Sequence, residues 1–314
     1  GNAQTFRELT CNAQRKKDHE GQQVGLNLSR ATLLGILKYP WTHEQAKEEG
    51  ESKFSIYQDL ASSYGNWLFD SLEPPAGGFL KFRKEAPKTL ACSIMDIADT
   101  IAYSVHDLQD AFASGFLRSD KVAGDEFRYY MRQFYLDKCG GNSNDFEQHL
   151  KRIRMDLANA EPGPFGQTKP WMEISAELIR EFIEALEMVD TDFAEPFHVR
   201  LKMDESTKGY MDFLRFVVRR FVVLDVRVKQ AAHQSELIIS KLFDAFFDIK
   251  DLQQFDFLNI LHSRGIENLA KRSSEAAKAR YICDLIYSMS EGQAIETYQR
   301  LFTPKSLNPY APIV

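Results

Sequence analysis

The sequence contains few cysteines, and none of them form a closely spaced pair. The four are Cys11, Cys92, Cys139 and Cys283, spread over 314 residues. This spacing excludes the disulfide framework of small secreted proteins and the CxxC pairs of common zinc sites. We therefore expect free thiols in a reducing, cytoplasmic compartment.

The sequence also lacks a long apolar run and an excess of positive charge. Its most apolar stretch, residues 213–226, is interrupted by three arginines and one aspartate, whereas a membrane-spanning helix needs roughly 20 apolar residues. The formal net charge of −6 gives no general attraction to nucleic acids or anionic membranes. Glycine-rich phosphate-binding motifs, GxSxG and HExxH are absent as well. We expect no membrane segment, and no common motif marks the site.

Helical periodicity dominates what is present, because apolar residues recur every three or four positions along most of the chain. Helices are predicted at residues 26–39, 88–116, 122–138, 143–158, 173–189, 205–229, 234–248 and 265–288. Asn27 or Ser29 is expected to cap the first helix, and Pro40 to end it. The predicted fold class is therefore all-α.

Loops and one strand-like segment separate these helices. Loops are predicted at residues 40–53, 73–79 and 161–170, and residues 197–203 alternate in the manner of a strand. We expect this strand to form at most a minor hairpin. A boundary near residue 118 would divide the chain into residues 1–118 and 119–314, two helical regions that share a core.

The predicted helix at 88–116 contains the stretch DIADTIAYSVHDLQDA, residues 96–111, with polar groups along one face. Asp99, Tyr103 and Asp107 stand at i, i+4 and i+8, so they stack along the helix opposite its apolar residues. No lysine or arginine occurs between Thr89 and Leu117. The stretch is either a solvated acidic face or one wall of a site where an external cation balances the carboxylates.

Two lysines and a tyrosine form a second group of candidates. Lys38 and Tyr39 stand in LKYPW, at a predicted helix end, and Lys53 stands in SKFSIY. A cation at a helix C-terminus complements the helix dipole, which is sufficient reason for a surface lysine there. The alternative is that these side chains donate hydrogen bonds to phosphate oxygens.

Three further features allow more than one interpretation. Asn2 belongs to GNAQTFR, a polar group with no evident internal purpose. His106 and Asp107 resemble the ligand doublet of some metal-dependent hydrolases. They lie far along a helix without a second histidine nearby, so we interpret His106 as a flanking or helix-packing residue and not as a ligand. The arginines of RRF, residues 219–221, are either the polar edge of an amphipathic helix or a phosphate contact.

Four stretches now resemble, in chain order, landmarks of one family: GNAQTFR, GLNLSRATLLGILKYPW, DIADTIAYSVHDLQDA and ICDLIYSMSEGQAIETYQRL. The resemblance is to the deoxynucleoside triphosphate triphosphohydrolases, the dGTPase-like members of the HD metal-dependent phosphohydrolase superfamily. It implies an HD-like helical bundle that hydrolyses a dNTP to a deoxynucleoside and inorganic triphosphate. It also implies a divalent metal, which is Mn²⁺, Mg²⁺ or Fe²⁺, and a homo-oligomer, either a hexamer or a tetramer.

The resemblance also assigns roles to single residues. The family's last metal-binding aspartate matches Asp99. Its sugar-binding and phosphate-binding residues match Tyr103, Asp107, Lys38, Tyr39, Lys53 and Asn2. In this assignment Tyr103 lies against the deoxyribose and excludes a 2′-hydroxyl, and Asp107 accepts a hydrogen bond from the 3′-hydroxyl. The Lys53 motif departs from the family, because Ser55 replaces its glycine.

A larger departure concerns the catalytic groups. The family's first histidine ligand, its histidine–aspartate doublet and its catalytic histidine and glutamate all precede the GNAQ landmark, which here begins at Gly1. We therefore expect an N-terminally truncated chain of a dNTP triphosphohydrolase that does not catalyse the reaction alone. Thr100 also stands where many relatives have a second aspartate.

Two other hypotheses stay open. The first is a non-catalytic helical module of HD-like fold that senses nucleotides or drives oligomerisation. The second is binding of single-stranded DNA through Arg152, Arg154, Arg219 and Arg220, which the acidic net charge disfavours.

Overall fold

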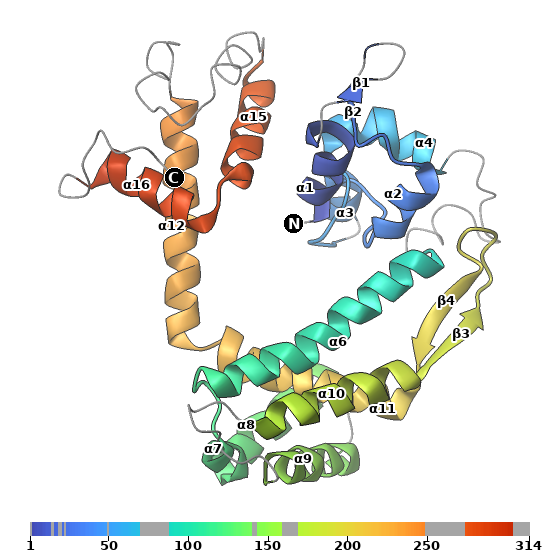
Figure 1. Cartoon of the computed structure of the whole chain (residues 1–314), viewed down its shortest axis with the longest axis vertical. Helices are drawn as coiled ribbons and strands as arrows, with labels where there is room; N and C mark the ends of the chain where they lie inside the picture. Colours follow the sequence, from blue (N-terminus) through green and yellow to red (C-terminus); the bar gives the residue numbers. More distant parts are fainter. Residues whose placement is uncertain are drawn as a thin grey trace. The chain divides into compact units, whose positions relative to one another are not determined.

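A computed structural model of the chain describes residues 2–13, 16–17, 21, 23–48, 50–69, 88–139, 143–158, 169–248 and 274–303 (Figure 1). The chain divides into two compact units, residues 1–223 and residues 224–314. Each unit is considered by itself. The boundary that we expected near residue 118 lies inside the first unit.

The first unit is built mainly of helices around one long helix. Its elements in chain order are α1 (Asn2–Arg7), η1 (Glu8–Asn12), β1 (Lys16–Lys17), β2 (Gln23–Gly25), α2 (Arg30–Ile36), α3 (His43–Glu48), η2 (Gln58–Leu60), η3 (Ala61–Gly65), α4 (Asn66–Phe69), α6 (Leu90–Ala113), α7 (Ser119–Ala123), α8 (Asp125–Cys139), α9 (Ser143–Ala158), α10 (Lys169–Glu184), β3 (Leu186–Asp190), β4 (Val199–Met203), α11 (Glu205–Val218) and η4 (Arg219–Val223). The long helix α6 contacts α2, α10, α11 and β4. It is therefore the element through which distant segments meet.

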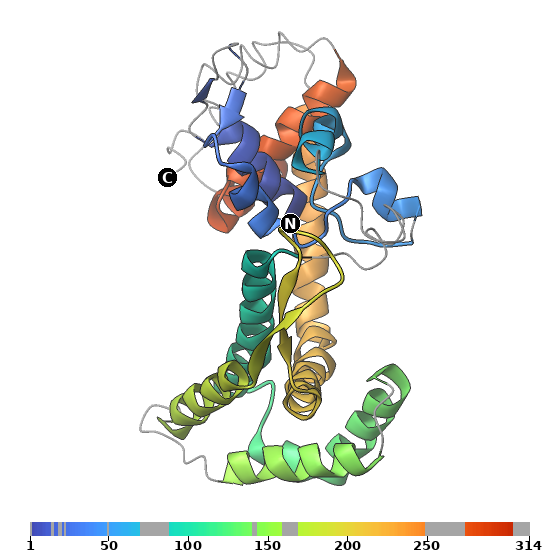
Figure 2. The same cartoon turned by 90° about the vertical axis from the view of Figure 1, so that its right-hand side faces the viewer.

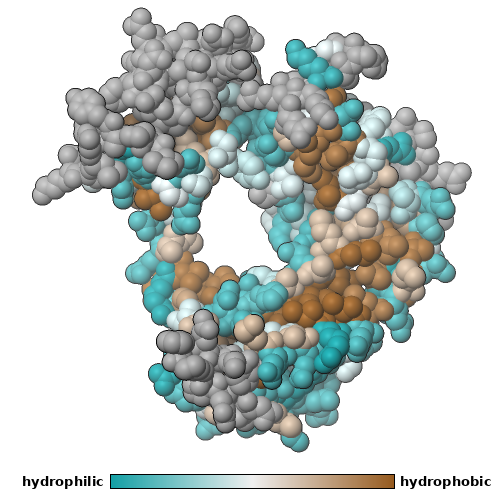
Figure 3. Space-filling model, in the orientation of Figure 1, coloured by the Kyte–Doolittle hydropathy of each residue, from teal (hydrophilic) through white to brown (hydrophobic). Residues whose placement is uncertain are grey.

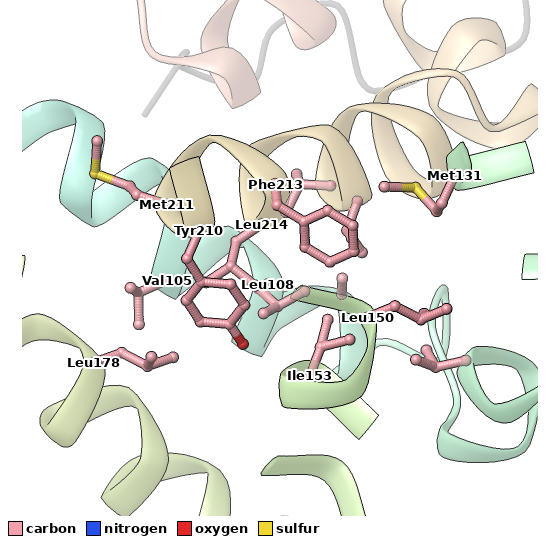
Figure 4. Packing of buried hydrophobic residues seen from close by; sticks show 14 of the residues in the cluster. Val105, Leu108, Met131, Leu150, Ile153, Leu178, Tyr210, Met211, Phe213 and Leu214 are labelled. Atoms are coloured by element: carbon pink, nitrogen blue, oxygen red, sulfur yellow. The ribbon is translucent and has the colours of Figure 1, made fainter. Parts of the chain in front are cut away.

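Helix α6 forms where the periodicity predicts it. Thr89 caps its start, because the Thr89 side chain accepts a hydrogen bond from the Cys92 amide. Val105 and Leu108 of its apolar face are each 1% exposed. They belong to the main core, in which Tyr210 and Phe213 of α11 lie between α6, α9 and α10 (Figure 4). Burying a side chain such as Phe213 contributes about 2–3 kcal/mol.

The strand-like segment forms the expected hairpin. β3 and β4 pair antiparallel, from Leu186 opposite Met203 to Asp190 opposite Val199. The hairpin runs beside the first half of α6 (Figures 1 and 2) and is held there by a hydrogen bond from the Leu201 amide to Ser93 Oγ, 3.2 Å. β1 and β2 form a second, very short antiparallel pair that the sequence did not predict.

The N-terminal elements enclose a second core cluster. Its buried members are Phe6, Leu33, Leu34, Leu37, Ile56, Leu60, Leu68 and Phe197. Phe197 belongs to the turn of the β3–β4 hairpin, so this cluster joins segments almost 200 positions apart in the sequence. The packing fixes the end of α2, where LKYPW begins.

The second unit contains α12 (Val226–Phe247), α15 (Glu275–Ser288) and α16 (Glu291–Phe302). Ile238, Leu242 and Phe246 of α12 are buried together with Ile282 of α15. Ser290 starts α16 with a reciprocal capping box to Gln293. Across both units, no described helix, not even the 24-residue α6, has the uninterrupted apolar length of a membrane span.

The all-α prediction is confirmed, and some boundaries are corrected. Ser29 caps α2 as expected, but α2 ends at Ile36, before Pro40. The predicted loop at 40–53 contains the short helix α3. The helix expected at 173–189 ends at Glu184 and gives way to β3, and the helix expected at 205–229 is interrupted between Val218 and Val226. The predicted loop at 73–79 and residues 161–168 of the predicted loop at 161–170 lie outside the described residues. The last two positions of that second loop, Lys169 and Pro170, belong to α10 instead.

Candidate functional site

One pocket of about 490 Å³ in the first unit gathers most of the residues that the sequence singles out. It is lined by Lys38, Tyr39, Lys53, Asp96, Asp99, Thr100, Tyr103, Arg215, Phe216 and Arg219. The segments after α2, around residue 53, along α6, and at the end of α11 each contribute to this pocket. Five of the seven predicted site residues therefore share one cavity.

Lys38, Tyr39 and Lys53 are placed by a clasp between two short segments. The Tyr39 amide donates to Ser55 Oγ at 3.2 Å, and Trp41 Nε1 donates to the Lys53 carbonyl at 2.6 Å. Lys53 Nζ lies 5.6 Å from the centre of the Tyr39 ring, a cation–π distance. Ser55, the residue that departs from the family pattern, thus provides one of the bonds that hold the clasp.

The α6 wall carries two carboxylates that face the Lys38 ammonium. Lys38 Nζ lies 2.8 Å from Asp96 Oδ1 and 2.6 Å from Asp99 Oδ2. Burial alone would lower the pKa of Lys38, but the hydrogen bonds to Asp96 and Asp99 outweigh it and raise that pKa to about 12. Lys38 is therefore a permanent cation. Tyr103, one turn beyond Asp99, keeps 37% of its surface exposed toward the pocket.

The opposite wall comes from α11 and the π-helical turn η4. Arg215 and Arg219 stand at i and i+4, so both lie on one edge of the helix. Arg215 Nη1 is 2.9 Å from Asp212 Oδ1. No acceptor for the Arg219 guanidinium is found within the described residues. π-helical turns are rare and often occur at functional sites.

The pocket is positively charged in a chain whose net charge is −6. Lys38, Lys53, Arg215 and Arg219 stand against the carboxylates of Asp96 and Asp99. Cations that converge on one cavity attract a polyanion and lower the cost of bringing its charges together. The thiol of Cys92, a fully buried residue of α6, is no competing nucleophile, because burial raises its pKa to about 11.

Two predicted site residues lie outside this lining. Asn2 begins α1 and is exposed. Asp107 is half-buried, one helical turn beyond Tyr103. Burial raises its pKa above the usual aspartate value, and the charges of Asp110 and Asp99 raise it further. His106 is exposed on α6.

Asp99 does not stand in a complete metal site. Within the described residues, no group of three or more histidine, cysteine, aspartate or glutamate side chains is arranged to hold a metal ion. Asp99 faces a lysine instead, although its side chain is 69% exposed and open to other partners. These residues offer at most one or two carboxylate ligands, fewer than the three protein ligands that are typical of catalytic zinc sites.

Apolar residues form a brown band in Figure 3, where α6 runs in the same view of Figure 1. Ile94 is 49% exposed and Met95 is 36% exposed. Met95 precedes Asp99 by four positions, so the two share a face of α6. The apolar surface of α6 therefore extends beyond the residues that are buried in the core of the first unit.

The arginines considered for single-stranded DNA are largely engaged in internal contacts. Arg152 bonds both carboxylate oxygens of Glu181, at 2.9 and 2.5 Å. Arg154 donates to the carbonyls of Val122 and Ala123. Arg220 lies over the Tyr130 ring, 4.5 Å from its centre. Of the four arginines considered for single-stranded DNA, only Arg219 lines the pocket.

Comparison with known proteins gives a consistent result. A family model described as a phosphohydrolase-associated domain matches residues 201–300. Curated proteins named deoxyguanosinetriphosphate triphosphohydrolase-like protein match 96% of the chain, with 27% identity in Bifidobacterium longum and 28% in Vibrio vulnificus. The chain is similar to these dGTPase-like proteins over nearly its whole length. The relative from Shewanella sediminis, with 26% identity over 98% of the chain, agrees.

The resemblance to the dGTPase-like family is thereby confirmed over nearly the whole chain. The chain spans 63% of the Bifidobacterium longum relative and 69% of the Vibrio vulnificus relative. The matched phosphohydrolase-associated region includes α11 and η4, and hence the two pocket arginines.

Some lining residues were not singled out from the sequence. They are Asp96, Arg215 and Phe216. Asp96 was visible only as one more acid of the α6 face, and Arg215 only as an interruption of an apolar stretch. Arg219, by contrast, was considered as a phosphate contact because it belongs to RRF.

Proposed function

We propose that this chain binds a deoxynucleoside triphosphate as part of a dNTP triphosphohydrolase of the HD superfamily. The proposal is carried by the convergence of Lys38, Lys53, Arg215 and Arg219 on one cavity beside Tyr103. The names of the relatives favour dGTP as the substrate. Metal dependence belongs to the proposal: Asp99 would provide one oxygen ligand, and the remaining ligands would have to come from outside the described residues.

In this proposal the four cations bind the triphosphate group. They neutralise the negative charge of the triphosphate, which increases when water adds to the α-phosphorus and the 5′-oxygen of the sugar leaves and takes up a proton. Tyr39 adds a hydroxyl donor beside Lys53. These groups converge from three separate segments, so they fit a ligand with several phosphates better than a single phosphate.

Tyr103 and Asp107 would bind the sugar. The Tyr103 ring is half-exposed at the end of the pocket, where it provides a flat surface for deoxyribose. A ring pressed against C2′ leaves no room for a 2′-hydroxyl, so ribonucleotides would be excluded. Asp107 follows one turn later, and only its ionised form accepts a hydrogen bond from the 3′-hydroxyl without donating one.

The binding part of the proposal is tested by titration calorimetry with inorganic triphosphate. Arg219→Met removes a cation from the pocket, and we expect about 10- to 150-fold weaker binding, because a charge-assisted hydrogen bond is worth about 1.5–3 kcal/mol. Arg220→Met is the matched control, since the neighbouring guanidinium lies over Tyr130. Equal affinities in both variants and in the unchanged protein would contradict the assignment of the pocket.

The second candidate is a nucleotide-sensing module without catalysis. It is favoured by the absence of a metal-binding cluster from the described residues and by the pairing of Asp99 with Lys38. Because the family's histidine ligands precede the GNAQ landmark, the assay uses the chain joined to its upstream segment. Incubation of this protein with each dNTP and Mn²⁺, followed by ion chromatography, separates the two functions. Release of inorganic triphosphate that is lost in Asp99→Ala supports the hydrolase. Binding of dGTP without any release supports the sensing module.

A further inference from the structure

Lys38 is held in a row of alternating charges that extends behind the pocket. Its ammonium lies between Asp96 Oδ1 and Asp99 Oδ2, at 2.8 and 2.6 Å. The other oxygen of Asp96 is bonded to the ammonium of Lys88. The row therefore reads Lys88, Asp96, Lys38 and Asp99.

The two carboxylates in this row are not equivalent. The Asp96 side chain is 26% exposed and uses both oxygens, whereas the Asp99 side chain is 69% exposed. Burial opposes ionisation of Asp96, but the bonds from Lys38 and Lys88 outweigh it and hold its pKa below the usual value. Asp96 is thus a fixed anion, and Asp99 is the partner that solvent or a ligand can reach.

Lys88 offsets the negative charge that Asp96 places beside Lys38. A carboxylate next to Lys38 orders the ammonium but weakens its attraction for a phosphate. Lys88 provides a second cation for the same carboxylate, so the positive charge of Lys38 stays available to the pocket. Lys88 does not line this pocket. It lines a neighbouring cavity of about 380 Å³, which shares Asp96 as its wall.

We propose that Asp96, neutralised by Lys88, is a positioning residue that holds the Lys38 ammonium at the wall of the pocket, ready to exchange Asp99 for a phosphate oxygen. The proposal rests on the proposed function, because it takes the anion in the pocket to be the triphosphate group. A lysine side chain loses considerable rotamer freedom when it is fixed. Asp96 fixes Lys38 before the ligand arrives, so that loss does not weaken binding.

The test uses a variant that removes the anchor without changing the net charge. Asp96→Asn together with Lys88→Met removes one negative and one positive charge. We expect this double variant to bind inorganic triphosphate about five- to tenfold more weakly than the unchanged protein, from the usual cost of ordering a long side chain. A purely electrostatic influence predicts no change in the double variant and tighter binding in Asp96→Asn alone.

A matched control is available elsewhere in the first unit. Arg128 and Glu147 form an exposed ion pair at 2.7 Å, away from the pocket. Arg128→Met together with Glu147→Gln is equally neutral, and it should bind triphosphate like the unchanged protein. Thermal melting of both double variants checks that the fold is retained.

Adding Lys38→Met distinguishes positioning from a general structural effect. If Asp96 acts through Lys38, then Lys38→Met costs much less affinity in the double variant than in the unchanged protein. If the double variant damages the pocket in some other way, the two losses simply add. Additive losses would overturn the positioning role, as would triphosphate affinity in the double variant equal to that of the unchanged protein.

The same titrations separate this inference from the proposed function. Absence of triphosphate binding by the unchanged protein would overturn both. Binding that depends on Lys38 but not on Asp96 and Lys88 would leave the proposed function intact and overturn the positioning role alone.

Discussion

The hydroxyl of Tyr210 offers a sharp test of how α11, the helix that carries Arg215 and leads directly into Arg219 of η4, is held in place. Tyr210 is 2% exposed, and its hydroxyl donates to Asp156 Oδ2 at 3.0 Å. The Arg152 guanidinium lies 4.0 Å from the centre of the Tyr210 ring. Tyr210→Phe deletes one oxygen atom, and it leaves the ring and its packing in the core (Figure 4) unchanged.

The expected cost follows from the character of the acceptor. A hydrogen bond to a charged group contributes about 1.5–3 kcal/mol, and Asp156 is only half-buried, so we expect a loss of about 2 kcal/mol. For a unit of 150–250 residues, 1 kcal/mol shifts the melting temperature by about 2–4 °C. Tyr210→Phe should therefore lower the melting temperature of the first unit by about 4–8 °C.

Tryptophan fluorescence is the appropriate assay. The three tryptophans, Trp41, Trp67 and Trp171, all lie in residues 1–223, so the signal reports on the first unit alone. Tyr129→Phe is the matched control, because Tyr129 is 59% exposed and its hydroxyl only accepts a bond from Gln133. A shift in Tyr210→Phe no larger than in Tyr129→Phe would refute the reasoning.

The pH dependence of this difference provides a second check. Burial raises the pKa of Asp156 above the usual aspartate value, although the Tyr210 bond and Arg152 act in the opposite direction. Below that pKa the carboxyl is neutral, and the bond from Tyr210 becomes an ordinary one worth about 1 kcal/mol. The stability difference between Tyr210→Phe and the unchanged protein should therefore shrink on acidification. A difference that grows would contradict an ionised acceptor.

The remaining predictions concern a buried histidine, a turn and the sugar contact. Burial lowers the pKa of His149, so the folded state binds fewer protons than the unfolded state. The contribution of His149 to the free energy of unfolding should therefore be complete above about pH 6.5 and decline below it. In urea titrations, His149→Phe should abolish this decline. Gly25 has φ +54°, and an added Cβ would lie 2.2 Å from the Leu9 carbonyl oxygen. Gly25→Ala should therefore lower the free energy of unfolding by more than about 2 kcal/mol or prevent folding. Gly50→Ala is the control: its Cβ meets nothing within 4 Å, so the loss should be less than about 2 kcal/mol. Tyr103→Ala should reduce the preference for dGTP over GTP in binding titrations, and an unchanged preference would remove Tyr103 from the sugar site.

Local signals account for the parts of the fold that the sequence predicted. Thr89 and Ser29 are capping residues directly before apolar periodicity, and both caps form. The missed helix α3 also has a local signal, since THEQ is a capping box in which Thr42 and Gln45 bond reciprocally. That helix was therefore predictable, and only the polar composition of residues 40–53 concealed it.

Other features depend on partners that sequence order does not reveal. Residues 186–190 continue the apolar spacing of α10 without a proline or glycine, yet they form β3 because β4 pairs with them. The pocket is a similar case. Arg215 follows Asp99 by more than 100 positions, and the two walls meet only because α11 packs across α6 in the main core. The i, i+4, i+8 spacing of Asp99, Tyr103 and Asp107 predicts the wall of the pocket that α6 forms. It contains no information on the wall that α11 and η4 form.

The same helix that stabilises the core also presents cations to the pocket, and the two roles can be separated by experiment. The buried residues of α11, Tyr210, Phe213 and Val217 among them, lie on one face, and Arg215 and Arg219 lie on the other. Arg215 at the end of α11 and Arg219 at the start of η4 stand on continuous helical backbone, whereas Lys38 and Lys53 stand on loops and require the clasp and Asp96. Well below its melting temperature, Tyr210→Phe should thus bind triphosphate with unchanged affinity. Weaker binding there would mean that the bond to Asp156 sets the position of the arginines as well as the stability of the unit.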